Sequence, residues 1–223
     1  MRLRYHLFAF LVVVAGFGTF SDSASAAGCK APRDAADLVV NVNVDIGEPV
    51  ISNSLSKAEL GTSSFHGREG QILGTTESGF ELRWAINYEL IKWRNVYCFW
   101  TARADVDISY QQLDVNIAAE YAPGSCQYEA VLDHENEHVE VAQSVMRPYA
   151  QQIKVALTSL AIPTAHLPSV ANSPEIAQEE VEEVFRQTLL PVRDKMVQLL
   201  SERQAEVDTL ENYRRTWQRC REW

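Results

Sequence analysis

The sequence is poor in the residues that mark the more specialised classes of protein. Its 223 residues include only 10 glycines, 8 prolines and 4 cysteines. This composition excludes a collagen-like or low-complexity chain, and four cysteines are too few for a small scaffold held together by disulfides. Acidic residues outnumber basic ones, and the formal net charge is −10. Binding to nucleic acid or to an anionic membrane is therefore disfavoured as a main function.

Motifs of several common enzyme classes are also missing. The chain has no glycine-rich phosphate loop, no G-x-S-x-G nucleophile motif and no convincing pair of cysteine and histidine for nucleophilic catalysis. After residue 26, no apolar run approaches the roughly 20 residues that a membrane-spanning helix needs. We therefore expect no integral membrane segment in the exported protein.

The first 26 residues follow the order of a secretory signal peptide. Arg2 and Arg4 precede an apolar run over residues 7–20, and small residues follow up to Ala26. We expect cleavage after Ala26, and a secreted or periplasmic protein in which residues 27–223 form one domain. A lipoprotein attached through Cys29 is the alternative that remains open.

Export changes how the four cysteines are interpreted, because disulfides form in oxidising compartments. Two disulfides can form, with three possible pairings. We favour Cys98–Cys126, which would join a strand to the start of a helix, and Cys29–Cys220, which would tie the two ends of the mature chain. Neither spacing resembles a cysteine cluster that binds zinc.

The part of the chain before residue 123 predicts a sheet. Apolar and polar residues alternate over 40–46 and 80–88, which is the period of a strand with one buried face. Shorter segments also predict strands, over 96–100, 104–110 and 113–117. Glycine, serine and threonine are frequent over 61–74, which predicts a loop or a short hairpin. We expect the pairing to be mostly antiparallel.

The part after residue 123 predicts helices. Apolar residues recur at helical spacing from Cys126 to about residue 160, with Ser125 as the N-cap. Pro148 should kink this helix or break it in two. A connector with two prolines follows over 162–171.

A second helical segment runs from Ile176 to about residue 213, with Ser173 as its N-cap and an interruption at Pro191. The fold class is therefore α+β. It combines an N-terminal, mostly antiparallel sheet with a central helix and a long C-terminal helical segment.

The central helix contains the pattern H-E-x-x-H, formed by His134, Glu135 and His138. Positions i and i+4 lie on the same side of a helix one turn apart, so both imidazoles can reach one zinc ion. Glu135 projects beside the metal without having to bind it. It can take a proton from a water molecule that the metal has acidified and pass it to a leaving amine.

A zinc hydrolase needs a third protein ligand and an open fourth position. The longer pattern H-E-x-x-H-x-x-G-x-x-H is absent, because Val141 and Ser144 stand where the glycine and the third histidine would be. A carboxylate from a second helix is the common alternative, so Asp208 and Glu211 of the C-terminal helix rank first. The candidates are Asp208, Glu211, His166 and His66.

Around the motif, the sequence resembles the core of the bacterial predicted secreted zinc-dependent proteases, a zincin-like family. The resemblance is carried by Cys126-x-Tyr128 and by the stretch Val131-Leu132-Asp133-His134-Glu135-Asn136-Glu137-His138-Val139. It also includes the signal peptide, the strand around 79–88 and the strand after Cys98. The resemblance implies a zinc site at His134 and His138, with Glu135 as the catalytic acid and base.

Together these patterns predict a secreted or periplasmic zinc-dependent hydrolase, a peptidase that acts on a peptide or protein substrate. Tyr110, Tyr149 and Tyr213 could each donate a hydrogen bond to a developing oxyanion, although a core or edge position is commoner for such residues. The alternative function is a non-catalytic periplasmic module that binds a partner or has a structural role. In that module the metal site would be vestigial or absent.

Overall fold

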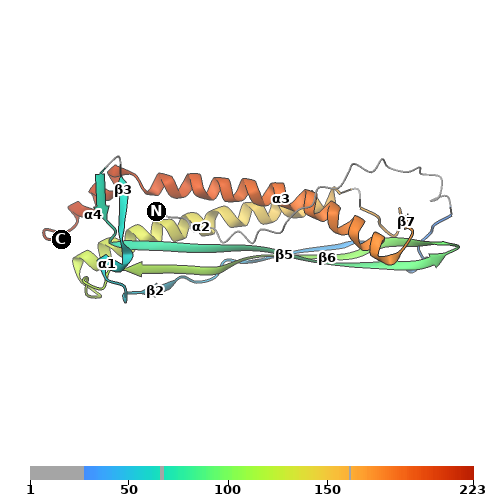
Figure 1. The fold of residues 1–223 in the computed structure, drawn as a ribbon, viewed down its shortest axis with the longest axis horizontal. Helices are drawn as coiled ribbons and strands as arrows, with labels where there is room; N and C mark the ends of the chain where they lie inside the picture. Colours follow the sequence, from blue (N-terminus) through green and yellow to red (C-terminus); the bar gives the residue numbers. More distant parts are fainter. Residues whose placement is uncertain (1–27, 66–67, 161) are drawn as a thin grey trace.

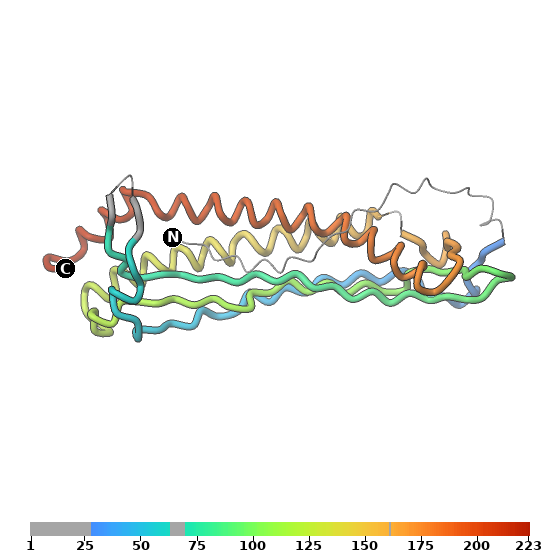
Figure 2. The backbone as a smooth tube through the Cα atoms, in the orientation of Figure 1, coloured from blue at the N-terminus to red at the C-terminus, as the bar shows by residue number. Residues whose placement is uncertain are grey.

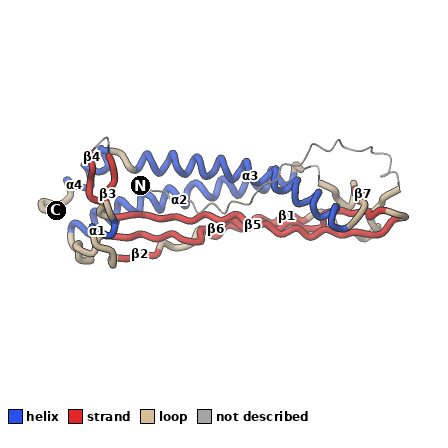
Figure 3. Tube along the Cα trace, viewed as in Figure 1, coloured by secondary structure: helices blue, strands red, loops and turns tan. Residues whose placement is uncertain are grey.

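A computed structural model describes residues 28–65, 68–160 and 162–223, and it describes no side chains between 63 and 69. The predicted signal peptide at 1–26 and the candidate ligand His66 lie outside this description. The chain forms an elongated structure in which two long helices lie along one face of a long, narrow sheet (Figure 1; Figure 3). Within the described ranges, no helix is both long and apolar enough to cross a membrane.

A long hairpin forms the centre of the sheet. Its strands β5 (Gly74–Trp93) and β6 (Val96–Ile117) pair antiparallel along their full length. At about 3.3 Å per residue, β6 extends for roughly 70 Å. The short strand β7 (Ser169–Ala171) pairs antiparallel with the beginning of β6. Figure 2 shows that one long helix leads from the end of β6 back to the end of the molecule where β7 lies, and that a second long helix then runs in the opposite direction towards the C-terminus.

The expectation of a mostly antiparallel sheet is wrong for two strands. β1 (Val39–Asp45) and β2 (Val50–Ser52) both pair with β6 in parallel, with the same sequence offset, so they form one interrupted path. A disulfide between Cys29 and Cys98 ties the preceding segment to the beginning of β6. The chain that follows Cys29 therefore runs in the same direction as β6. Alternating hydrophobicity predicts a strand but carries no information about its direction.

The three strands predicted over 96–100, 104–110 and 113–117 are parts of the single strand β6. The gaps between them are β-bulges, where Ala102 and Gln111 have no partner in the register with β5. An extra residue on one strand shifts the alternation by one position. The sequence pattern is interrupted there although the strand continues.

The two faces of the sheet differ in polarity. The face towards the helices carries buried apolar side chains of β6, namely Ala104, Val106, Ile108, Leu113, Val115 and Ile117. On the opposite face, Asn41 and Asn43 of β1 donate hydrogen bonds of 2.7 and 2.9 Å to Asp105 and Asp107. This is the pattern of a sheet with one face on the core and one in water.

Two long helices cover the apolar face. α2 (Cys126–Thr158) packs on the sheet, and α3 (Pro174–Val207) packs on α2 (Figure 1). The predicted N-caps are confirmed, because Ser125 accepts a hydrogen bond from the Tyr128 amide and Ser173 accepts one from the Ile176 amide. One hydrophobic core joins the sheet to both helices.

The interruption expected at Pro191 is wrong, and of the two outcomes expected at Pro148, a kink or a break, the break does not occur. Pro148 lies inside α2 and Pro191 inside α3, and each helix continues past its proline. A proline in a helix leaves the carbonyl four residues earlier without its usual donor. Here those carbonyls belong to Ser144 and Gln187, and both residues are exposed, as are the prolines. Water can therefore satisfy them.

Smaller elements gather at the end of the molecule where the chain ends. α1 (Lys57–Leu60) leads into the hairpin of β3 (Thr62–Phe65) and β4 (Arg68–Gln71), which agrees with the loop or hairpin predicted for 61–74. α3 ends at Val207, earlier than predicted. A separate helix, α4 (Leu210–Gln218), follows with Thr209 as its N-cap.

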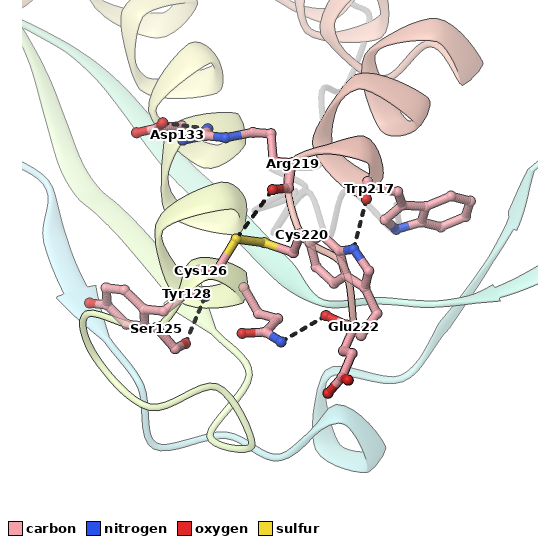
Figure 4. The surroundings of a disulfide bond; sticks show 10 residues. Ser125, Cys126, Tyr128, Asp133, Trp217, Arg219, Cys220 and Glu222 are labelled. Carbon is pink, nitrogen blue, oxygen red and sulfur yellow. Dashed lines mark hydrogen bonds and ion pairs between the residues drawn. A yellow bond between two sulfur atoms is a disulfide. The ribbon is translucent and has the colours of Figure 1, made fainter.

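All four cysteines form disulfides, but the favoured pairing is wrong. The bonds are Cys29–Cys98 and Cys126–Cys220. Cys98 lies at the beginning of β6, and Cys126 follows the end of that strand, so the length of β6 separates them. Figure 4 shows the second bond joining the first turn of α2 to the segment after α4.

Candidate metal centre

The motif histidines lie near the beginning of α2, on the side of the helix that faces the protein. His134 and His138 are only 6% and 5% exposed. Their rings are nearly perpendicular, with centroids 5.1 Å apart, which is close to the ~5.4 Å rise of one helical turn. Spacing of four residues and burial of this helix face therefore place both imidazoles in one enclosed region.

The third member of the group is Asp208, which caps the C-terminus of α3. Its Oδ1 lies 3.2 Å from Nε2 of His138 and 3.6 Å from Nε2 of His134. One ligand atom from each of these residues lies within 4.8 Å of the others, which makes the group a possible metal site. The early end of α3 allows this arrangement, because Asp208 falls in the break between two helices.

These distances fit a metal ion at the centre of the group. Metal–ligand bonds of about 2.1 Å at tetrahedral angles separate two ligand atoms by about 3.4 Å, close to both observed distances. Two imidazole nitrogens and one carboxylate oxygen are a ligand set that catalytic zinc sites use. The residues present therefore fit a zinc ion.

Gln204 fixes the orientation of His138. Its Nε2 donates a 3.0 Å hydrogen bond to the backbone carbonyl of His138, which directs its Oε1 at Nδ1 of the ring. An amide oxygen can only accept, so Nδ1 must carry a proton. In the protonated ring, Nε2 donates to Asp208 at 3.2 Å, and in the neutral ring its lone pair is available to a metal ion. Such a hydrogen bond behind a ligand is typical of metal-binding histidines.

Tyr213 of α4 holds the carboxylate from the other side. Its hydroxyl donates a 2.8 Å hydrogen bond to Oδ1 of Asp208, and its ring lies 5.0 Å from that of His134. The Nδ1 atom of His134 is buried and has no hydrogen-bond partner in the described part of the chain. The two histidines are thus oriented differently, one by a hydrogen bond and one by packing.

The charges of the group favour an anionic Asp208. Burial alone would raise its pKa, but hydrogen bonds from His134, His138 and Tyr213 hold the pKa far below its usual value. For His138, burial alone would lower the pKa. The contacts with Asp208 and Glu135 outweigh burial and raise this pKa above its usual value. The carboxylate thus stabilises positive charge at this point, either a proton or a cation.

Glu135 lies beside the group and is only 4% exposed. The hydroxyl of Thr76 lies 2.8 Å from Oε2 of Glu135 and 3.1 Å from its backbone carbonyl oxygen, and it shares its one proton between these two acceptors. Burial raises the pKa of this carboxyl group, while the neighbouring histidines and Thr76 act in the opposite direction. Gly74 comes so close that an added Cβ would lie 2.7 Å from Oε1 of Glu135.

The outer side of α2 anchors the segment that carries Tyr213. Glu137 pairs with Arg215, and Asp133 pairs with Arg219 (Figure 4). The disulfide of Cys126 lies on the same side of α2. These contacts hold α4 against the motif helix, so that both contribute to one site.

The other predicted residues lie elsewhere. Glu211 is exposed on α4 and does not belong to the group of possible ligands. His166 is exposed in the connector between α2 and α3, where it pairs with Asp37 at 2.8 Å. Tyr110 donates to the backbone carbonyl of Ala142, and Tyr149 is buried in a small apolar cluster.

Sequence reasoning missed two residues of the site. Gln204 precedes Asp208 by four positions, so helical spacing places both on one face, and this signal could have identified it. Thr76 offered no comparable signal, because only the pairing of β5 with β6 and the packing of α2 bring it to Glu135.

Comparisons with protein-family models, with curated proteins and with solved structures find no match to this chain.

Proposed function

We propose that this chain is a secreted or periplasmic zinc-dependent hydrolase, a peptidase, in which His134, His138 and Asp208 hold the ion. The observation that carries the proposal is the convergence of these three ligand atoms within 4.8 Å, directly beside the buried carboxyl group of Glu135. The proposal includes membership of the predicted secreted zinc-dependent proteases, which the motif residues support.

A bound zinc ion supplies Lewis-acid chemistry, since it acidifies water and polarises a carbonyl oxygen. Glu135 takes a proton from the attacking water and delivers it to the leaving nitrogen. Thr76 keeps the carboxyl group of Glu135 in place through its 2.8 Å hydrogen bond. Gln204 and Tyr213 orient His138 and Asp208, so that the site is formed before substrate binds.

Export is part of the proposal. The signal-peptide pattern at 1–26 supports it, and two disulfides are compatible with an oxidising compartment. A peptidase with an exported, disulfide-linked fold would act on peptides or proteins outside the cytoplasm.

The proposal is tested by hydrolysis of an unstructured protein such as casein by the zinc-loaded mature chain. Glu135→Gln should lower turnover by at least about 100-fold, because general acid–base catalysis contributes that much or more. Its zinc content should remain that of the wild type. Retained turnover in this variant contradicts the mechanism, and an inactive wild type with bound zinc favours the binding module.

A further inference from the structure

A cavity of about 110 Å³ opens beside His134 and Glu135. α2 contributes these two residues and Val131. The segment from Gly70 to Gly74, which joins β4 to β5, forms a second wall. The third wall is one face of α4, with Leu210, Tyr213, Thr216 and Trp217.

The lining of this cavity is mainly apolar. Ile72, Leu73 and Val131 all line it, and Glu135 is the only acidic side chain among the lining residues. Leu210 and Trp217, which are 41% and 50% exposed, extend the apolar surface outwards. Binding of an apolar group in such a cavity is favourable, because the group displaces water from apolar surface.

The volume limits the size of the group that fits. A cavity of ~150 Å³ accepts a benzene molecule. The smaller cavity here fits a branched aliphatic side chain better than an aromatic one. Its lining contains no lysine or arginine, and its one histidine, His134, is a ligand in the proposed metal site. An acidic side chain would therefore be buried without a partner, which is costly.

We propose that this cavity accepts one aliphatic side chain of the peptide substrate, such as leucine, next to the bond that is cleaved. The inference rests on the proposed function. His134 belongs to both the metal group and the cavity wall, and Glu135 lines the cavity next to it. A side chain seated in the cavity therefore places the adjoining backbone at the site. Leu210 is then a residue that determines specificity.

The test uses the zinc-loaded mature chain and internally quenched peptides that differ only at one position X. The residues compared at X are Leu, Phe, Ala and Asp. We expect kcat/KM for Leu to exceed that for Ala by at least about 10-fold, in the range of apolar pockets that discriminate by size. Leu should also exceed Phe, and Asp should be the poorest. Equal values for the Leu and Asp peptides overturn the proposal.

Leu210→Arg places a cation at the rim of the cavity. It should lower kcat/KM for the Leu peptide by at least about 10-fold and raise that for the Asp peptide. The matched control is Leu167→Arg, since Leu167 is 77% exposed in the connector far from the cavity. The control should keep the wild-type order of the four peptides. Both variants should keep the zinc content and the melting temperature of the wild type. A wild-type order of peptides in Leu210→Arg overturns the assignment of this residue.

The milder variant Leu210→Ala enlarges the cavity without adding charge. It should raise kcat/KM for the Phe peptide relative to the Leu peptide. An unchanged ratio counts against the cavity as the side-chain site.

Binding separates this inference from the proposed function. Calorimetry with the zinc-loaded Glu135→Gln variant should show at least about 10-fold tighter binding of the Leu peptide than of the Asp peptide. Equal affinities overturn the cavity assignment, whether or not the wild type cleaves peptides. Selective binding without hydrolysis by the wild type supports the cavity and contradicts the peptidase proposal.

Discussion

Gln204 contacts His138 at two points, one on the ring and one on the backbone. Its amide nitrogen donates to the carbonyl of His138 at 3.0 Å, and its amide oxygen accepts from Nδ1 of the ring. The first bond sets the direction of the amide, and the second therefore sets which ring nitrogen carries the proton. Gln204 of α3 thus determines that the Nε2 atom of His138, on α2, faces Asp208.

Gln204→Leu should weaken zinc binding by about 10- to 100-fold, the usual effect of losing a hydrogen bond behind a metal ligand. Leucine has a similar size but cannot orient the ring. Gln198→Leu is the control, because Gln198 is exposed on the same helix. Competition with a chelator of known affinity measures both variants. Equal zinc affinity in the two variants contradicts the orienting role of Gln204.

Gly74→Ala should destabilise the protein by about 1–3 kcal/mol, the usual cost of forcing extra atoms into a packed region. The added Cβ would lie 2.5 Å from Cγ1 of Val131 and 2.7 Å from Oε1 of Glu135. Turnover should fall as well, because the carboxyl group of Glu135 must move. Gly79→Ala in the same strand is the control, since its Cβ would meet nothing closer than 3.6 Å. Denaturant unfolding and casein hydrolysis measure the two effects, and equal behaviour of both variants would refute this packing argument.

Tyr110 should make the stability depend on pH in the alkaline range. Burial raises the pKa of this residue from 10 to about 12. A raised pKa in the folded state gives stability that is fully present below about pH 10 and is lost as the pH rises to 12. The loss should approach about 3 kcal/mol, since each unit of pKa corresponds to ~1.4 kcal/mol.

Tyr110→Phe isolates this contribution. At neutral pH the variant should be less stable than the wild type by about 1 kcal/mol, because it lacks the hydrogen bond to Ala142. Above pH 10 the difference should shrink and then change sign, so that the variant is the more stable protein near pH 12, because only the wild type loses up to about 3 kcal/mol. Unfolding curves over this range measure it, and a constant difference would show that burial does not shift the titration of Tyr110.

The two disulfides should differ in their effect on the metal site. Replacing either pair of cysteines by serine should cost about 2–5 kcal/mol of stability, which is typical for a native disulfide. Loss of Cys126–Cys220 should also weaken zinc binding, because this bond fastens the segment after α4, and α4 carries Tyr213. Loss of Cys29–Cys98, at the other end of the molecule, should leave zinc affinity unchanged. Equal zinc affinities in the two double variants would contradict this role.

The local features of the fold could be predicted from the sequence. Ser125 and Ser173 cap helices because their hydroxyl groups bind amides within the same turn, and the four-residue spacing of His134 and His138 brings them together on one helix. Both features depend only on neighbours in the chain. The third member of the metal group, Asp208, was only one of four candidates in the sequence. The end of α3 places it at the two histidines.

The remaining features depend on distant parts of the chain. The parallel pairing of β1 with β6 joins distant parts of the chain, and no local pattern encodes it. The pairing of Cys126 with Cys220 depends on α4 folding back over α2. The helices continue past Pro148 and Pro191, where the prolines and the residues four positions earlier are exposed, and this exposure depends on how the helices pack.

The most direct test of the account is the zinc content of the purified mature protein, measured beside Asp208→Asn and the control Glu211→Gln. We predict one zinc ion per chain in the wild type and in Glu211→Gln. Asp208→Asn should lose most of its zinc during dialysis, because a neutral amide replaces the anionic ligand. A wild type without zinc after reconstitution, or an Asp208→Asn variant that retains a full equivalent, would contradict the metal centre.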